Sequence, residues 1–213
     1  MYREEVICRY VQDKDVLDCG GVDHDALELK GPRGDWLHAI VSRHAKSCIG
    51  VDILRESVEE INSRGDHAFL VADAEALPFE AQFDVVVAGE LVEHIYNVGL
   101  FLDSAWRSLR EDGVLIATTP NAYALSSTLY ASVLGRERCH PEHTCYYSPQ
   151  TLSYVVTHHG FTVEELLLLP RPARWRVVKW FRWVACKFRP IMHETLVLVA
   201  RKGRTQEKYG DKW

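Results

Sequence analysis

The sequence predicts an α/β fold in which a doubly wound, mostly parallel sheet carries helices on both faces. The first observation is that short apolar runs, typical of buried strands, alternate with segments whose apolar residues recur at helical spacing. The second is the composition. The 213 residues are 47% hydrophobic and 26% charged, which suits one packed core and excludes a disordered chain. A closed α/β barrel needs eight strand–helix units, and the first 120 residues show only five predicted strands.

Seven segments are predicted as strands. The first, Asp15–Cys19, is a short apolar run that ends at Gly20 and Gly21, as expected for a buried strand followed by a tight turn. The other strands are expected at 47–52, 68–72, 83–88, 114–118, 161–169 and 194–200. The last two are placed to close the sheet as a hairpin-like pair.

Five segments between the strands carry helical patterns. They are expected at 36–41, 55–64, 98–110, 120–135 and 148–159. In the helix at 98–110, for example, Leu102, Ala105 and Leu109 fall on one face, and Gly113 follows the end of the helix. Helices that alternate with strands in this way are expected to cover both faces of a parallel sheet.

The chain is expected to form one domain over residues 1–203, with a core at 14–120 and a polar tail at 204–213. No apolar run approaches the ~18 residues of a membrane span, and Met1–Glu5 does not open a signal peptide. None of the six cysteines forms a CxxC pair, so reduced thiols and a cytoplasmic location are expected. The net charge of −5 argues against a general nucleic-acid binder.

Small and polar residues follow the predicted strands at their carboxyl ends, where doubly wound sheets bind ligands. Gly20 and Gly21 let a ligand approach the backbone closely, and the carboxylate of Asp52 is placed to accept both hydroxyls of a ribose. The spacing of roughly 30 residues between them fits a ligand that contains a nucleoside. On the alternative interpretation, the glycine pair is only a turn and Asp52 caps the following helix.

Seven short motifs follow one another over about two thirds of the chain, from Val16 to about Gly160. They are 16–21 (VLDCGG), 50–52 (GVD), 73–79 (DAEALPF), 83–86 (FDVV), 90–94 (ELVEH), 109–115 (LREDGVL) and 119–121 (TPN). In order and spacing they resemble class I S-adenosylmethionine-dependent methyltransferases. The ELVEH and TPN motifs are most similar to the ubiquinone-type O-methyltransferases and to relatives encoded with glycan-assembly enzymes. The resemblance implies a seven-stranded sheet with an antiparallel last strand, and S-adenosylmethionine as the cofactor.

The resemblance also implies which residues hold that cofactor. Gly20 would lie against its methionine part, Asp52 would bind the ribose hydroxyls, and Ile53 would pack on adenine. Asp73 would meet the adenine amino group, and Glu90 would border the sulfonium. The full implied set is Asp18, Gly20, Gly21, Asp52, Ile53, Asp73, Ala74, Gly89 and Glu90.

Two features of the sequence depart from this family. Val22 and His24 stand where the family has its second and third glycines, so Gly21 is expected to carry the turn in place of Val22. In addition, the chain begins only about fifteen residues before its first predicted strand. We therefore expect little room for the N-terminal helices that cover the cofactor in the family.

Three histidines are candidate catalytic residues. Methyl transfer is an in-line displacement, so the protein must align the acceptor with the methyl group and help remove a proton from a hydroxyl acceptor. His94 follows the fourth strand, near the expected place of the sulfonium. His140 and His143 lie in the segment 121–160, where the family places acceptor specificity. A backbone-satisfied residue of a helix N-terminus is the alternative for His94.

Two groups of residues are candidate metal ligands, and neither is favoured. Glu90, Glu93 and His94 can gather on one helical turn, a pattern implied to bind magnesium in the ubiquinone-type relatives; roles in the cofactor wall and in capping are favoured here. The segment Cys139–Cys145 packs two Cys and two His into seven residues, whereas a structural zinc site places one ligand pair apart from a second. A substrate-facing loop is favoured for that segment.

Segment 171–190 is the exception to the acidic balance. It contains five Arg, two Lys and no acidic residue, together with three of the six Trp. As a helix it places apolar residues such as Trp180 on one arc, and basic residues such as Arg176 and Lys179 on the other. Such a helix suits the interface of an anionic membrane, or alternatively packs on the sheet between the last two strands. No nucleic-acid partner is expected, because no recognition motif accompanies the basic residues.

These features predict a methyltransferase that uses S-adenosylmethionine. O-methylation of a saccharide or a lipid-linked saccharide is the favoured reaction, with the enzyme in the cytoplasm and peripheral on the membrane through 171–190. The alternatives are methyl transfer to a soluble small molecule, such as a phenol or an antibiotic precursor, and a non-catalytic cofactor-binding module. A nicotinamide-dependent reductase is disfavoured, because the DAE and ELVEH motifs have no role in one.

Overall fold

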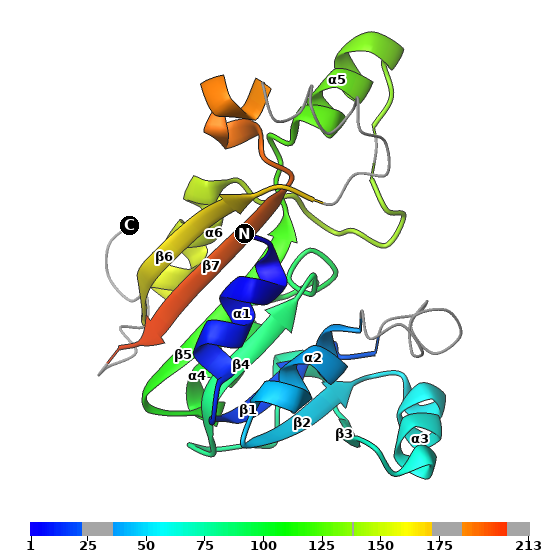
Figure 1. The fold of residues 1–213 in the computed structure, drawn as a ribbon, viewed down its shortest axis with the longest axis vertical. Coiled ribbons are helices and arrows are strands. Elements are labelled where there is room, and N and C mark those ends of the chain that lie inside the picture. Colours follow the sequence, from blue (N-terminus) through cyan, green and yellow to red (C-terminus); the bar gives the residue numbers. More distant parts are fainter. Residues whose placement is uncertain (23–35, 138, 172–184, 204–213) are drawn as a thin grey trace.

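The computed structural model describes residues 1–22, 36–137, 139–171 and 185–203. Seven strands form one sheet in the order β3-β2-β1-β4-β5-β7-β6 (Figure 1). Strands β1 to β5 run parallel, and β7 runs antiparallel to both of its neighbours, β5 and β6. The α/β class, the seven strands and the antiparallel last strand are therefore confirmed.

The strands coincide with the predicted apolar runs. Their bounds are β1 Asp15–Cys19, β2 Ser47–Asp52, β3 Ala68–Val71, β4 Phe83–Gly89, β5 Leu109–Pro120, β6 Phe161–Leu169 and β7 Thr195–Lys202. In β1, β4 and β7 nearly every side chain is buried, as expected for central strands that are covered on both faces.

Strand β5 begins at Leu109, where the sequence predicted the last turn of the helix at 98–110, so that helix boundary is wrong. The reason lies in Arg110. Its guanidinium donates hydrogen bonds to Asp15 Oδ2 (2.9 Å) and Asp84 Oδ1 (2.8 Å), near the beginnings of β1 and β4. These bonds hold the chain extended beside the sheet, although the apolar periodicity of the helix continues through Leu109.

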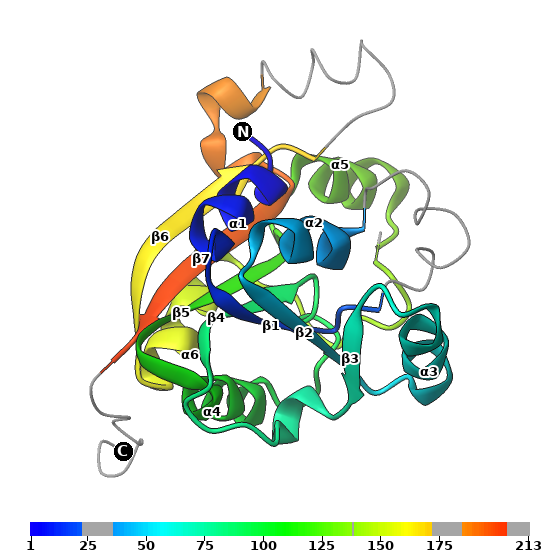
Figure 2. The ribbon, with the colours of Figure 1, turned by 60° about the horizontal axis from the view of Figure 1, so that its bottom comes forward.

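Helices cover both faces of the sheet (Figure 2). Their bounds are α1 Arg3–Val11, α2 Leu37–His44, α3 Arg55–Arg64, α4 Val98–Ser108, α5 Leu125–Leu134 and α6 Pro149–His158. On one face, Val6 of α1 and Val41 of α2 are fully buried in a common core with residues of β1, β4 and β7. On the other face, Leu102 of α4 and Leu152 of α6 are buried in a second core. Helix α3 packs beside β3 at the sheet edge.

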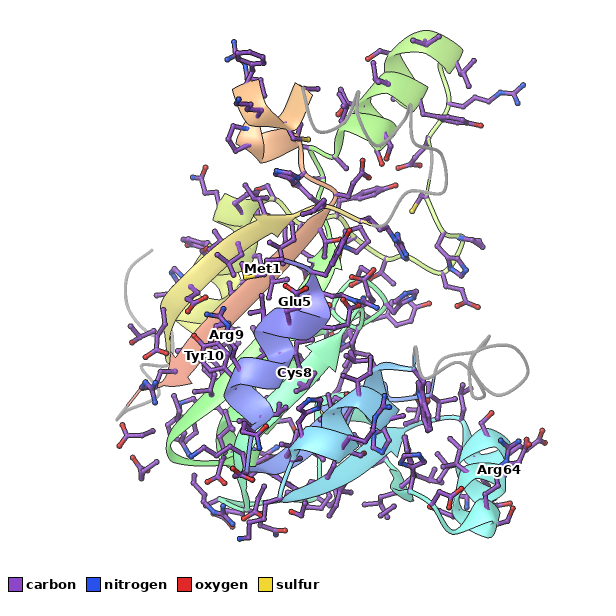
Figure 3. All side chains as sticks on the ribbon, viewed as in Figure 1. Met1, Glu5, Cys8, Arg9, Tyr10 and Arg64 are labelled. Carbon is purple, nitrogen blue, oxygen red and sulfur yellow. The ribbon has the colours of Figure 1, made fainter. Side chains whose placement is uncertain are left out.

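Helix α1 was not predicted. Its apolar residues Val6, Ile7 and Val11 are fully buried, and their spacing is the sequence signal that would have indicated a helix. Figure 3 shows Arg9 and Tyr10 on the side of α1 nearest β6, where both donate hydrogen bonds to the carboxylate of Glu165. Nine residues nevertheless suffice for one N-terminal helix, which packs on α2 and the sheet.

The predicted helix at 120–135 begins later, at Leu125. Pro120 ends β5, and the buried side-chain amide of Asn121 donates to Ile191 O and His193 O, both at 2.7 Å. Asn121 Oδ1 also accepts a hydrogen bond from Tyr123 N, which forms a turn that separates the strand from the helix. Helix α6 matches its prediction to within one residue at each end, and the Ser148 side chain caps it by accepting a hydrogen bond from Thr151 N.

Most of the predicted amphipathic helix at 171–190 lies outside the described residues, as does the tail at 204–213. Within the part of the chain that the structure describes, no helix is long and apolar enough to cross a membrane.

Candidate functional site

The turn after β1 is built around Gly20. Gly20 has a φ of +69°, which glycine adopts without strain, and a Cβ added there would lie 2.8 Å from Leu91 Cδ1. The expectation that Gly21 carries the turn is therefore wrong. The backbone amides of Gly20 and Gly21 both donate to Val51 O, at 2.9 and 3.4 Å, and the chain reaches this arrangement by turning at the first glycine.

Asp52 ends β2 and connects two neighbouring loops. Its Oδ2 accepts a hydrogen bond from Val22 N and its Oδ1 one from Leu54 N, both at 3.1 Å. Leu54, not Asp52, is the N-cap of α3, so the alternative of a simple helix cap does not describe Asp52. The residue is 9% exposed, so its carboxylate is nearly buried at the end of the strand.

Beyond β2 and β3, one apolar and one acidic side chain face solvent. Ile53 is 68% exposed, which is unusual for an isoleucine beside a buried strand end. Asp73 is exposed, and its Oδ1 accepts a hydrogen bond from Glu75 N at 2.9 Å, which begins the short helix η3 (Ala74–Ala76). Ile53 follows β2 and Asp73 follows the paired strand β3, an arrangement that suits the apolar face and the polar edges of an adenosine. The residues present therefore fit an adenosine-containing cofactor.

Asp18 is buried and turned toward α2. It is 2% exposed, and its Oδ2 lies 2.9 Å from His38 Nδ1. Beside it, Trp36 Nε1 donates a hydrogen bond of 2.7 Å to Gly21 O. Asp18 is thus placed to position the glycine turn. The sequence analysis gave Trp36 and His38 no role, and only their place at the start of a predicted helix after the glycine pair pointed to them.

Gly89 and Glu90 follow β4 next to the end of β5. Glu90 has a φ of +54°, a conformation that non-glycine residues adopt at some cost. Its backbone N–H donates to Thr118 O at 3.0 Å, which holds it there. Arg3 of α1 pairs with the Glu90 carboxylate at 3.3 Å. Burial lowers the pKa of the Arg3 guanidinium, but Glu90 and Glu4 outweigh burial and leave that pKa raised. Helix α1 therefore reaches the site.

Glu93 points away from solvent into the protein. It is 1% exposed, and among the described residues neither carboxylate oxygen has a partner at hydrogen-bonding distance and angle, although the Thr119 side chain is near enough to lower the pKa of Glu93. Burial, reinforced by the negative charge of Glu90, raises the pKa of Glu93 to about 8. At neutral pH this carboxyl is therefore mostly protonated, which makes it a poor ligand for magnesium.

Two loops meet beyond β4. Thr144 N donates to Glu93 O at 2.8 Å, and Thr144 Oγ1 lies 3.0 Å from Glu93 O and 2.8 Å from Ile95 O. Cys145 Sγ contacts Val92 O at 3.8 Å. The segment at 139–145 is thus fixed on the loop that follows β4, although the two are far apart in the sequence.

This junction brings His94, His140 and His143 together. The ring centroids of His94 and His143 are 4.7 Å apart. The ring centroid of His140 lies 5.9 Å from that of His94 and 5.7 Å from that of His143. Burial lowers the pKa of His94 and of His143, and the neighbouring imidazoles lower both further. Both rings are therefore mostly neutral at pH 7. The three residues predicted separately as catalytic candidates form one cluster.

Potential metal ligands gather at one place among the described residues. Only His94, His140 and His143 form a group of three or more His, Cys, Asp or Glu whose donor atoms all lie within 4.8 Å of one another. Neither Glu90 nor Glu93 belongs to that group, so the structure does not assemble the candidate magnesium cluster. Cys139 and Cys145 do not belong to it either.

Comparison with known proteins identifies the family. A model of the family described as "Methyltransferase domain" matches residues 5–166. The chain therefore belongs to the methyltransferase domain family, and it has the fold and motifs of the class I S-adenosylmethionine-dependent methyltransferases. This match covers more than two thirds of the chain.

Curated relatives and solved structures agree with this assignment. The chain is 29% identical over 180 residues to a ubiquinone biosynthesis O-methyltransferase of Azorhizobium caulinodans, covering 72% of this chain and 70% of that protein. It is 28% identical to a probable S-adenosylmethionine-dependent methyltransferase of Mycolicibacterium smegmatis, covering 60% of this chain and 48% of that protein.

Two solved structures share the fold at low sequence identity. YcgJ of Bacillus subtilis has a TM-score of 0.62 and 17% identity, covering 95% of this chain and 98% of that one. The 1,6-didemethyltoxoflavin-N1-methyltransferase of Burkholderia thailandensis, which was solved with S-adenosylhomocysteine, has a TM-score of 0.60 and 16% identity, covering 94% of this chain and 78% of that one.

Proposed function

We propose that this protein transfers a methyl group from S-adenosylmethionine to a hydroxyl oxygen of a small-molecule acceptor. The observation that carries the proposal is a juxtaposition at one end of the sheet. Residues that fit an adenosine lie beyond β2 and β3, and a cluster of three imidazoles lies beyond β4. Relatives named as ubiquinone biosynthesis O-methyltransferases support a hydroxyl, and in particular a phenol, as the acceptor class.

The cofactor-binding residues are proposed from their places in the structure. Asp52 binds the ribose hydroxyls, Ile53 packs on adenine, and Asp73 accepts from the adenine amino group, with Ala74 in backbone contact. Gly20 and Gly21 leave space for the methionine part, which Gly89 and Glu90 border on the opposite side. Asp18 contributes to cofactor binding indirectly, by positioning the glycine turn after β1. S-adenosylmethionine supplies the electrophilic methyl group, and these residues orient it toward the acceptor.

The acceptor side is assigned to the histidines. His94 follows β4 and is half-buried, so it is placed to take the proton of the acceptor hydroxyl or to orient that hydroxyl. His140 and His143 line the same cluster from the facing loop. The lowered pKa of His94 keeps its imidazole neutral at pH 7, the form that accepts a proton.

Turnover of the His94→Ala variant tests this assignment. We expect turnover with a catechol or phenol acceptor to fall about 10²-fold, while the affinity for S-adenosylhomocysteine stays within twofold of wild type. Methyl transfer from labelled S-adenosylmethionine gives the first quantity and calorimetry the second. The matched control is His158→Ala on α6, where the ring Nδ1 of the wild-type residue lies 2.7 Å from Tyr154 O, and it should leave both unchanged. Unchanged turnover of His94→Ala would remove this residue from the mechanism.

A saccharide carried on a polyprenyl lipid is the second candidate acceptor. The observation that favours it is the exposure of apolar side chains beside the basic segment: Phe188 is 71% and Ile191 45% exposed. Figure 1 shows residues 185–192 at the same end of the molecule as α5. Flotation with anionic vesicles, and its loss in high salt, tests this candidate. If Arg189→Glu together with Lys187→Glu leaves flotation unchanged, or if the wild type ignores anionic vesicles, the soluble acceptor stands.

A further inference from the structure

The cluster of three histidines has the composition of a metal site. Each residue offers one imidazole nitrogen, and the three donor atoms lie within 4.8 Å of one another. Nitrogen ligands at about 2.0–2.1 Å from a tetrahedral zinc ion lie roughly 3.3 Å apart. The rings therefore need to approach by no more than about 1.5 Å. The side chain of His140 is 56% exposed, so a change of its rotamer is not opposed by packing.

The backbone around the cluster is fixed before any ion binds. Thr144 joins the two loops through its hydrogen bonds to Glu93 O and Ile95 O. The turn at His140 is closed by the bond from His143 N to His140 O at 3.1 Å. A site with a preformed backbone needs only small side-chain movements, so little ordering opposes metal binding.

The charges near the cluster favour a cation. Glu142 Oε2 lies 3.9 Å from His140 Nδ1, which accepts a hydrogen bond from Glu142 N at 3.4 Å, so a negative charge stands beside this ring. Glu142 and Glu90 both act as negative charges on His94, and Glu90 acts on His143 as well. Arg171 acts on His143 as a positive charge, and Arg3 pairs with the Glu90 carboxylate at 3.3 Å. Glu142, beside His140, is therefore the acidic group that favours a cation most directly.

We propose that His94, His140 and His143 together bind one divalent first-row transition metal ion, with zinc as the favoured ion. Three imidazole nitrogens suit zinc, cobalt, nickel or iron and do not suit magnesium, which prefers oxygen ligands. Three protein ligands leave a fourth position for water or for an oxygen of the acceptor. The site itself does not depend on methyl transfer, whereas its use in orienting the acceptor rests on the proposed function.

Metal titration of tag-free protein tests this site. After dialysis against a chelator, we expect one zinc per chain, measured by elemental analysis, and a visible spectrum of four- or five-coordinate cobalt when Co²⁺ is added instead. His94→Gln, His140→Gln and His143→Gln should each weaken zinc binding at least 10²-fold. Magnesium at millimolar concentration should not compete. Unfolding midpoints in chelator verify that each variant is folded.

Three controls make the test decisive. His158→Gln, Cys139→Ser and Cys145→Ser should retain zinc affinity within threefold of wild type. Absence of bound zinc at micromolar concentrations, or equal losses in the cysteine variants, would overturn the proposal. Titration of S-adenosylhomocysteine onto metal-free protein separates the two proposals. Cofactor binding without zinc binding would leave the proposed function and remove the metal site, and zinc binding without cofactor binding would do the reverse.

Discussion

The two sides of the candidate site are held in different ways. On the cofactor side, the carboxylates of Asp18 and Asp52 are nearly buried and bond to His38 and to backbone amides of the adjoining loops. On the acceptor side, the histidines come from two loops that are far apart in the sequence, and the side chain of His140 is more than half exposed.

Because of this difference, substitutions on the two sides of the site are expected to have different effects. Removing a buried polar partner on the cofactor side leaves its counterpart unsatisfied in a place that water does not reach. Removing an exposed imidazole on the acceptor side leaves the packing intact. We therefore expect substitutions on the first side to destabilise the fold and substitutions on the second side to change binding and turnover only.

The largest effect is expected for His38→Ala. This change removes a fully buried ring and leaves Asp18 without that partner, so the free energy of unfolding should fall by roughly 3–5 kcal/mol. The matched change on the acceptor side, His140→Ala, should alter it by less than about 0.5 kcal/mol. Urea unfolding at pH 7 with chelator present measures both. Equal costs for the two variants would contradict the comparison.

Glu93 lies at the border of the two sides and gives a pH-dependent prediction. Its pKa is about 8 in the folded protein, against an ordinary value of 4.5, so between these values the folded state keeps a proton that the unfolded state has released. The stability that this proton contributes is fully present below pH 4.5 and is lost as the pH rises toward and through 8.

The Glu93→Gln variant removes this titration. Relative to the wild type, it should therefore gain roughly 4 kcal/mol of stability between pH 5 and pH 8.5, because its neutral side chain does not have to ionise in a buried place. Urea unfolding midpoints at pH 5, 7 and 8.5 give the two slopes, and other titrating groups cancel in the difference. Parallel pH profiles for the two proteins would show that Glu93 is ionised in the folded state.

The smallest effect is expected for Arg3→Ala. The pair of Arg3 with Glu90 is partly exposed, so its loss should change stability by less than about 1 kcal/mol. Because Glu90 is proposed to border the cofactor, the affinity for S-adenosylhomocysteine should still fall several-fold. Arg9→Ala, on the same helix but paired with Glu165, is the control and should leave that affinity unchanged. Equal affinities of the two variants for S-adenosylhomocysteine would show that α1 does not contribute to cofactor binding.

Local patterns explain most of what could be predicted from the sequence. All seven strands follow from apolar runs, because a strand covered on both faces is apolar throughout its length. Asp52, Ile53 and Asp73 lie at the carboxyl ends of β2 and β3, where the alternation of strands and helices placed them. The place of such a residue in the site can be predicted from its sequence position alone, because every parallel strand ends at the same edge of the sheet.

What could not be predicted depends on contacts between distant segments. Arg110 starts β5 early by bonding to residues of β1 and β4, which no local pattern encodes. The zinc interpretation of Cys139–Cys145 was disfavoured because two His and two Cys so close in sequence do not reach a tetrahedron. In the structure, His94 brings a third imidazole to His140 and His143, because the hydrogen bonds of Thr144 hold the two loops together. Helix α1 is the exception, because its apolar spacing was present in the sequence.

Calorimetric titration of S-adenosylhomocysteine onto the wild type, Asp52→Ala and His94→Ala tests the central claim most directly. The claim is that the edge beyond β1 to β3 binds the cofactor and the histidine loops serve the acceptor. We expect the wild type to bind, Asp52→Ala to lose roughly 2–4 kcal/mol of binding free energy, and His94→Ala to bind as the wild type does. Unfolding midpoints verify that Asp52→Ala is folded at the temperature used. No binding by the wild type at millimolar ligand, or equal affinities for wild type and Asp52→Ala, would contradict the account.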